Sequence, residues 1–305
     1  MKVSRTVDRE PCMIGTLVNT TRVLRAAWRL LSSDRDLLLF PVMMSAALFF
    51  VLLYVLVAFQ YGGTFSRITG SLDVHIADFV LLGIGYFGAA FVLAYFNASL
   101  VAAANYRLMG GTPDLRFGIE AANDRLGALA LWALVGSTVA LIVSRVAGLG
   151  GVLGRAATSF AEVLGLWAPF LVAPVMVIES STPFEAMRRS TEMFRETWGR
   201  TLVPNFGFGL VYTGLALLAI GVGAGSYAMT GSMGFSVIAA LFSLTVAATT
   251  VRCLETLFTV ALYNYATTGE TDGVFPEEYL RDSFVYKNDK GKFGPPSMPR
   301  RVTAQ

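Results

Sequence analysis

Six long apolar segments dominate this chain and restrict the folds that it can adopt. A helix needs about 20 apolar residues to cross the hydrocarbon core of a bilayer, and each segment reaches that length. Hydrophobic residues make up 54% of the 305 residues and charged residues only 15%, which leaves too few charges to cover a soluble surface. The sequence therefore predicts an all-α, polytopic membrane helix bundle with six transmembrane helices. The expected spans are 37–59, 77–104, 127–147, 160–179, 203–229 and 235–266.

The distribution of Lys and Arg between these segments predicts how the chain lies in the membrane. The two ends and the connections on their side carry 20 of these residues, whereas the other three connections carry three. Arg252 is the remaining one, inside the sixth segment. Cytoplasmic loops hold the excess of positive charge in membrane proteins. Both termini are therefore expected in the cytoplasm, and the protein in the plasma membrane.

The chain divides into three parts on this interpretation. Residues 1–36 are a cytoplasmic N-terminus with an amphipathic interfacial helix, and residues 37–266 are the transmembrane domain, with its six helices arranged as three hairpins. Residues 267–305 are a cytoplasmic tail, which is expected to be partly disordered because Lys, Gly and Pro accumulate toward its end.

The amphipathic helix before the first span has an apolar stripe with spacings of three and four residues. The stripe consists of Ile14, Leu17, Thr21, Leu24, Trp28 and Leu31. Arg22, Arg25 and Arg29 lie to one side of it. Either this helix lies on the membrane surface with its arginines at lipid headgroups, or it packs on the rest of the protein.

The two cytoplasmic connections contain short interfacial helices of their own. In the second connection, Thr182, Pro183 and Glu185 give a capping box with proline at the first helical position. Thr112 and Pro113 are expected to begin the helix of the first connection in the same way. With the arginines of the second helix included, the candidate lipid-headgroup contacts are Arg22, Arg25, Arg29, Arg188 and Arg189.

A weak internal repeat favours the arrangement in hairpins. The second and sixth segments each end in Asn-Tyr, followed by a glycine and a threonine, at an offset of 159 residues. The matching residues are Asn105, Tyr106, Gly110 and Thr112 in the first copy and Asn264, Tyr265, Gly269 and Thr271 in the second. The repeat indicates that the hairpins close with the same exit turn, although polar turn residues gather after any membrane helix.

Four polar residues are expected at one depth, near the cytoplasmic interface. Asn97, Arg252 and Glu255 lie about 20 residues from the outer ends of the second and sixth segments, and Glu179 ends the fourth. They form either a polar vestibule that binds a lipid headgroup or small solute, or a hydrogen-bonded layer that fixes helix packing. Arg252 is expected to pair across helices with Glu179, with Glu255 as its second partner.

Two stretches of the sequence follow a known pattern. Residues 28–41 read W-R-L-L-S-S-D-R-D-L-L-L-F-P, and residues 169–204 run through P-V-M-V-I-E and T-P-F-E-A-M-R-R-S to T-W-G. The matching positions are Trp28, Asp34, Arg35, Asp36, Pro41, Pro174, Glu179, Glu185, Ala186, Arg189, Ser190, Trp198 and Gly199. Together they resemble an uncharacterised family of six-helix prokaryotic integral membrane proteins, known as a domain of unknown function. The second stretch is also distantly similar to the membrane domain of some glycerophosphodiester phosphodiesterases. The resemblance implies topology and location, and no known activity.

The sequence contains no constellation that points to catalysis. A single histidine, His75, and two cysteines in different environments, Cys12 and Cys253, argue against a metal site or a Ser-His-Asp triad. We therefore expect no enzyme activity, no cofactor or metal, and no nucleic-acid partner. The leading hypothesis is a scaffold or accessory protein that binds membrane lipids or a cytoplasmic or membrane protein partner. The alternative is a small-solute or lipid transporter, which a continuous cavity from Asn97 to Glu179 would favour; a dry, packed core would favour the scaffold.

Overall fold

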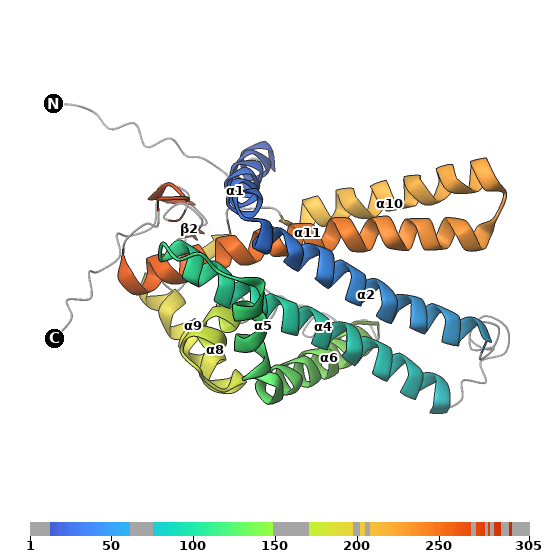
Figure 1. Cartoon of the computed structure of the whole chain (residues 1–305), viewed down its shortest axis with the longest axis horizontal. Coiled ribbons are helices and arrows are strands. Elements are labelled where there is room, and N and C mark those ends of the chain that lie inside the picture. The colour runs from blue at the N-terminus through green and yellow to red at the C-terminus, as the bar shows by residue number, and fades with distance from the viewer. Residues whose placement is uncertain are drawn as a thin grey trace.

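In the computed structural model, helices form most of the part of the chain that the structure describes (Figure 1). The structure describes residues 13–61, 76–148, 171–197, 202–204, 208–269, 273–277, 280, 284–287 and 293–294. The helices in this part are α1 (Met13–Ser33), α2 (Arg35–Tyr61), α4 (Ile76–Leu108), α5 (Leu115–Asn123), α6 (Leu126–Gly148), α8 (Val172–Ile178), α9 (Pro183–Thr197), α10 (Phe208–Thr230) and α11 (Met233–Thr268). The strands are β1 (Leu202–Pro204), β2 (Phe284–Lys287) and β3 (Phe293–Gly294).

Four of these helices, α2, α4, α10 and α11, are long and apolar enough to cross a membrane. They correspond to the first, second, fifth and sixth expected spans. The third expected span forms α6, which is 23 residues long. Most of the fourth, 160–179, lies outside the described residues, and its end forms the short helix α8. The described helices fit a membrane protein, as the composition indicated.

A small antiparallel sheet departs from the expected all-α architecture. β2 pairs with β1 on one side and with β3 on the other, so the C-terminal tail is joined to the segment before α10. Pro204 lies opposite Phe284 in this register. Because Leu202–Pro204 is extended, the fifth span begins at Phe208 rather than at the expected residue 203.

The long helices form two antiparallel hairpins, α2 with α4 and α10 with α11 (Figure 1). α4 and α11 contact each other and run in the same direction, and α2 also contacts α11. The α2 and α4 helices approach closely at Gly85, where a Cβ would clash with the Val55 side chain. Phe49 and Phe242 join α2 to α11, with ring centroids 5.4 Å apart.

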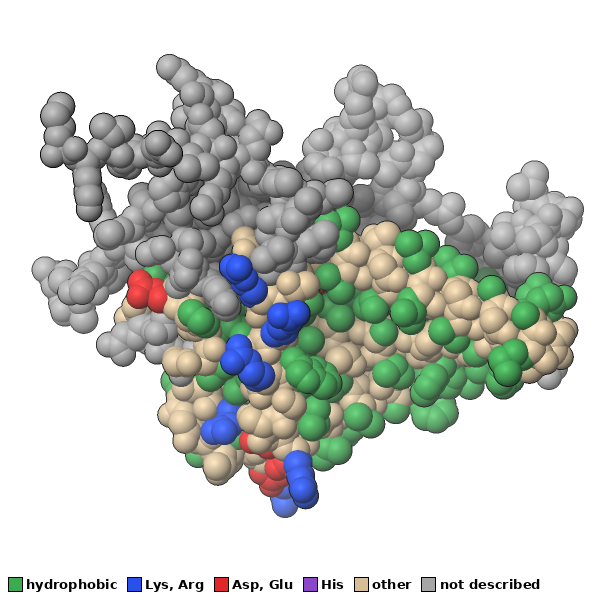
Figure 2. Space-filling view, turned by 90° about the horizontal axis from the view of Figure 1, so that it is seen from above, with side chains coloured by type: hydrophobic (Ala, Val, Ile, Leu, Met, Phe, Trp, Pro, Cys, Tyr) green, Lys and Arg blue, Asp and Glu red, His purple; other side chains and the backbone are tan. Residues whose placement is uncertain are grey.

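The buried core lies in the half of the bundle that was expected to face the cytoplasm. Every residue from 98 to 104 on α4 and from 253 to 263 on α11 is buried. Toward the other end, apolar side chains are exposed, among them Phe50, Tyr54 and Phe242. In Figure 2, apolar side chains cover the long, narrow part of the molecule, toward the right of the view. Lys and Arg side chains gather in a band to its left. This surface is the one that a helical membrane protein presents to lipid.

The C-terminal tail is docked on this core over the part that the structure describes. Phe275 and Leu280 are fully buried, and the ring of Phe275 lies 5.7 Å from that of Phe258 on α11. The buried side chains of Phe275 and Leu280 thus complete the core, and the part of the tail that was expected to be disordered begins only after them. Residues 295–305 lie outside the described residues.

The expected start of the second cytoplasmic helix is confirmed, and that of the first is shifted. The Thr182 amide donates to Glu185 Oε2 at 3.0 Å, and the Glu185 amide donates back to Thr182 Oγ1 at 3.5 Å. The backbone hydrogen bond from Thr182 lowers the pKa of the Glu185 carboxyl. In α5, Asp114 is the N-cap instead of Thr112, and its side chain accepts from the Arg116 amide at 3.4 Å.

The repeated exit turn of the second and sixth segments is also present. α4 ends before Gly110, which has a φ of +89°, and α11 is capped by Gly269, with a φ of +71°. Glycine adopts this left-handed conformation without the steric cost that a side chain brings. The two glycines of the repeat therefore do the same structural task.

Candidate functional site

Arg252, Glu255 and Tyr212 form a polar cluster between α10 and α11. Arg252 Nη1 donates to Glu255 Oε2 at 3.1 Å, and the Tyr212 hydroxyl donates to the same oxygen at 3.0 Å. The Glu255 side chain is 9% exposed, whereas that of Arg252 is 53% exposed. Arg252 and Glu255 share a helix face because they are three residues apart. The expected pairing of Arg252 with Glu255 is thus confirmed.

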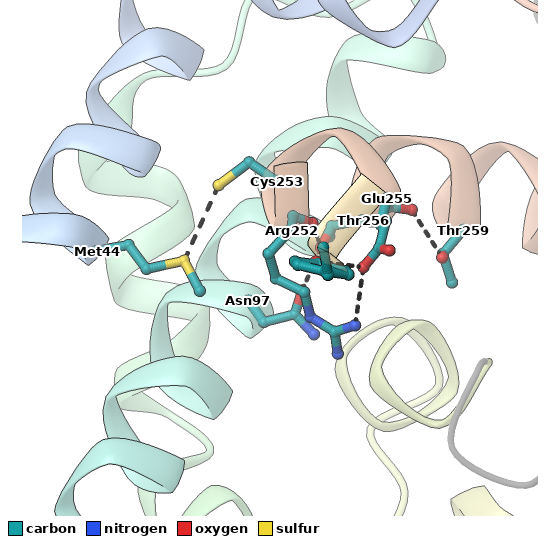
Figure 3. A network of polar contacts seen from close by, with 8 residues as sticks. Met44, Asn97, Arg252, Cys253, Glu255, Thr256 and Thr259 are labelled. Carbon is teal, nitrogen blue, oxygen red and sulfur yellow. Dashed lines mark hydrogen bonds and ion pairs between the residues drawn. The ribbon is translucent and has the colours of Figure 1, made fainter. Parts of the chain in front are cut away.

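Asn97 joins this cluster from α4 through Thr256 (Figure 3). The Thr256 hydroxyl contacts Asn97 Oδ1 and, at 2.9 Å, the carbonyl oxygen of Arg252. Arg252 follows the first residue of α11 by 19 residues, about 28 Å at the rise of a helix, so the cluster lies near one edge of a hydrocarbon core of about 30 Å. Three of the four residues of the expected vestibule therefore come together.

Glu179 belongs to a different cluster, and the expected ion pair between it and Arg252 is wrong. Glu179 accepts from the Tyr263 hydroxyl at 3.0 Å, and its other oxygen lies 3.6 Å from Arg189 Nε. Tyr263 follows Glu255 by eight residues, which is about 12 Å along α11. The prediction failed because it compared only the depths of the two residues, whereas α8 packs on α4 and also contacts α11, which brings Glu179 to Tyr263.

The α1 helix lies across the long helices and packs on α11 and α2 (Figure 1). Its buried face consists of Thr20, Val23, Ala26, Ala27, Leu30 and Leu31. The expected apolar stripe is therefore displaced around the helix, because Thr21 is exposed and Trp28 is 48% exposed. Of the two interpretations of this helix, the structure supports packing on the protein, and it leaves one face of α1 open.

The open face of α1 carries three arginines, Arg22, Arg25 and Arg29, which we name the α1 arginine row. All three are exposed, at spacings of three and four residues that place them on one side of the helix. The other two candidate headgroup contacts already have carboxylate partners. Arg188 Nε pairs with Glu192 at 3.0 Å, and Arg189 pairs with Glu179.

Sequence reasoning missed the residues that connect these groups between helices. Tyr212, Thr256 and Tyr263 each contact a predicted polar residue from a neighbouring helix. Their one signal in the sequence is the presence of hydroxyl groups in long apolar segments, where polar side chains hydrogen-bond across helices. A further ion pair, Arg107 Nε to Asp34 at 3.7 Å, ties the start of α2 to the end of α4.

Comparison with known proteins places the chain in a family. Neither a curated protein nor a solved structure matches it. A family of unknown function, DUF6159, matches residues 76–273, which include α4 to α11 and both polar clusters. The match covers about two thirds of the sequence, and the chain therefore belongs to the DUF6159 family.

Proposed function

We propose that this protein spans the plasma membrane six times, with both termini in the cytoplasm, and serves as a non-enzymatic scaffold that binds acidic lipids of the cytoplasmic leaflet. The observation that carries the proposal is the α1 arginine row. α1 is fixed by its buried face to α11 and α2, and its exposed face carries Arg22, Arg25 and Arg29. An interfacial helix with arginines beside an exposed tryptophan is suited to phosphate headgroups.

The packing of α11 favours a scaffold over a transporter. The alternative function would use a polar path between Asn97 and Glu179. All residues from Leu257 to Leu262, which separate the two polar clusters on α11, are buried. Phe258, in the middle of this stretch, is fully buried against Phe275. A packed apolar core at this place supports a static role for the bundle.

The topology is tested by labelling single cysteines in intact cells. In a variant without Cys12, a cysteine at Ser232, in the two-residue turn between α10 and α11, should react with an impermeant reagent from outside. Cysteines at Asp114 and Glu192 should react only after the cells are opened, because the charge distribution predicts that they lie inside. Buried Cys253 gives the unlabelled background. Labelling of Glu192→Cys in intact cells would contradict the six-span arrangement.

The lipid-binding role is tested by removing the α1 arginine row. In nanodiscs, phosphatidylglycerol should raise the Tm of the wild-type protein relative to phosphatidylcholine, and the triple variant R22Q/R25Q/R29Q should lose most of this gain. Each basic residue near an acidic membrane surface is worth about 1 kcal/mol, so three give a measurable difference.

The matched control for this experiment is R116Q on α5. Arg116 is exposed, like the arginines of the row, but it pairs with Glu120 at 2.7 Å, and its loss should leave the gain unchanged. High salt should reduce the gain of the wild-type protein, because exposed charges are screened. An undiminished gain in the triple variant would refute the lipid-binding role.

A further inference from the structure

One edge of the Arg252 guanidinium is held by the protein and the other is open. Nη1 donates to Glu255, which Tyr212 also holds, so the carboxylate is fixed from two sides. Among the described residues, Nε and Nη2 have no hydrogen-bond partner, and the side chain is 53% exposed. The Nε–Nη2 edge presents two parallel N–H groups, the geometry that binds two oxygens of one phosphate.

The polar surroundings of Arg252 extend onto a second helix. Thr256, one turn further along α11, contacts the Asn97 amide of α4 and the Arg252 carbonyl oxygen. In Figure 3 the Asn97 amide and the Arg252 guanidinium lie on the same side of α11. A ligand on the open edge of Arg252 would therefore meet polar groups of both helices.

Glu255 orients the Arg252 guanidinium and leaves its Nε–Nη2 edge free for a ligand. The carboxylate contacts only Nη1, and the Tyr212 hydroxyl donates to the same oxygen, which offsets part of its negative charge. A guanidinium held at one edge loses less conformational freedom when it binds a ligand at the other. An arginine that only extended into the headgroup region for its own solvation would need no such support.

We propose that the open edge of Arg252, bordered by Asn97, binds one phosphate group at the cytoplasmic face of the bundle. The phosphodiester of a phospholipid and free phosphate share the chemistry that this edge recognises. The inference rests on the membrane arrangement proposed above, which places Arg252 at the level of the lipid phosphates. Unlike the α1 arginine row, this site senses the phosphate and not the net charge of the lipid. It also holds a single molecule.

The test compares four ligands on delipidated protein in a non-ionic detergent. Phosphatidylglycerol, phosphatidylcholine, diacylglycerol and inorganic phosphate are each added, and bound ligand is measured by native mass spectrometry and phosphorus analysis at low and high salt. The wild-type protein should keep one molecule of either phospholipid at high salt and should not keep diacylglycerol. Competition by inorganic phosphate at comparable concentration would identify free phosphate as the preferred source.

The decisive variant is R252K, which keeps the positive charge beside Glu255 but lacks the two-pronged edge. Its Tm should stay near that of the wild type, while phosphate binding should weaken about tenfold or more, the effect of losing a charge-assisted hydrogen bond. The control R116K, at an exposed position of α5, should bind as the wild type does. Equal binding by R252K and wild type, or equal retention of diacylglycerol, would overturn the proposal.

The two lipid proposals fail independently in these experiments. The R22Q/R25Q/R29Q variant should lose the preference for phosphatidylglycerol and still keep one salt-resistant phospholipid. If it lost that phospholipid too while R252K kept it, the phosphate would belong to the α1 arginine row, and the assignment to Arg252 would be wrong.

Discussion

Replacement of Gly118 by valine is expected to destabilise the protein by about 3 kcal/mol, because α5 approaches α4 too closely there for a side chain. A Cβ at this position would lie 2.6 Å from the carbonyl oxygen of Ser99 and 2.8 Å from Cζ of Phe40. Neither neighbour can move easily. The Ser99 carbonyl oxygen belongs to the backbone of α4, and the Phe40 side chain is packed in the core, with 1% of it exposed. Thermal unfolding of the purified variant in detergent measures the loss.

The control for this variant is the same substitution at Gly127, in the first turn of α6. No atom lies within 4 Å of a Cβ built at Gly127, so G127V should unfold near the wild-type temperature. Similar losses in G118V and G127V would show that the contact between α5 and α4 is not the cause. The smaller change G118A should give an intermediate loss, because its Cβ alone already meets the Ser99 carbonyl.

Replacement of Phe275 by alanine should cost about 3–5 kcal/mol, the range for removing a fully buried phenylalanine. Phe275 belongs to the C-terminal tail, yet its side chain is 0% exposed and packs on Phe258. The variant should therefore unfold at a clearly lower temperature, and its tail should become sensitive to protease. An unchanged Tm together with a resistant tail would contradict the docking of residues 273–277.

The same substitution at Phe184 is the control, since this residue lies in α9 with its side chain 60% exposed. F184A should change the Tm little. A double-mutant cycle with F258A adds a second check, because residues in contact lose less together than the sum of their separate losses. Additive losses in F258A and F275A would place the two rings apart.

The long helices could be predicted because their signal is local. Twenty apolar residues in a row identify a spanning helix without knowledge of its neighbours, and α2, α4, α10 and α11 lie close to the expected spans. The capping box at Thr182 and Glu185 is equally local. The sheet was missed because three residues at β1 pair with a strand about 80 positions later, and no periodicity in so short a segment reveals its partner.

The buried face of α1 was misassigned because large residues dominate an apolar stripe. The predicted stripe included Trp28 because of its large apolar side chain, but this side chain is exposed. The helix packs on α11 and α2 with the small side chains of Ala26 and Ala27 in its buried face. Small residues allow two helices to approach closely, which compensates for their small apolar area. A pattern based on hydrophobicity alone cannot show whether a helix packs through large apolar side chains or through small ones that allow a closer approach.

The polar residues show the same limit between local and distant contacts. Arg252 and Glu255 pair along one helix and could be predicted from their spacing. The partners of Glu179, Tyr263 and Arg189, depend on how α8, α9 and α11 are placed and rotated against each other. Counting residues along a span predicts only the depth of a side chain in the membrane. Whether two charged side chains form an ion pair also depends on where their helices lie and which way each helix is rotated.

The contact between Asn97 and Thr256 joins residues that are 159 positions apart, the same offset that relates Asn105 to Asn264 and Gly110 to Gly269. Equivalent positions of two copies touch one another where the copies meet at a two-fold axis. α4 and α11, which run in the same direction, thus touch at equivalent positions of the repeat at this one point (Figure 1). The likeness ends there, because α2 packs on α11 while α10 has no comparable contact with α4, so the two copies have been placed in unequal surroundings.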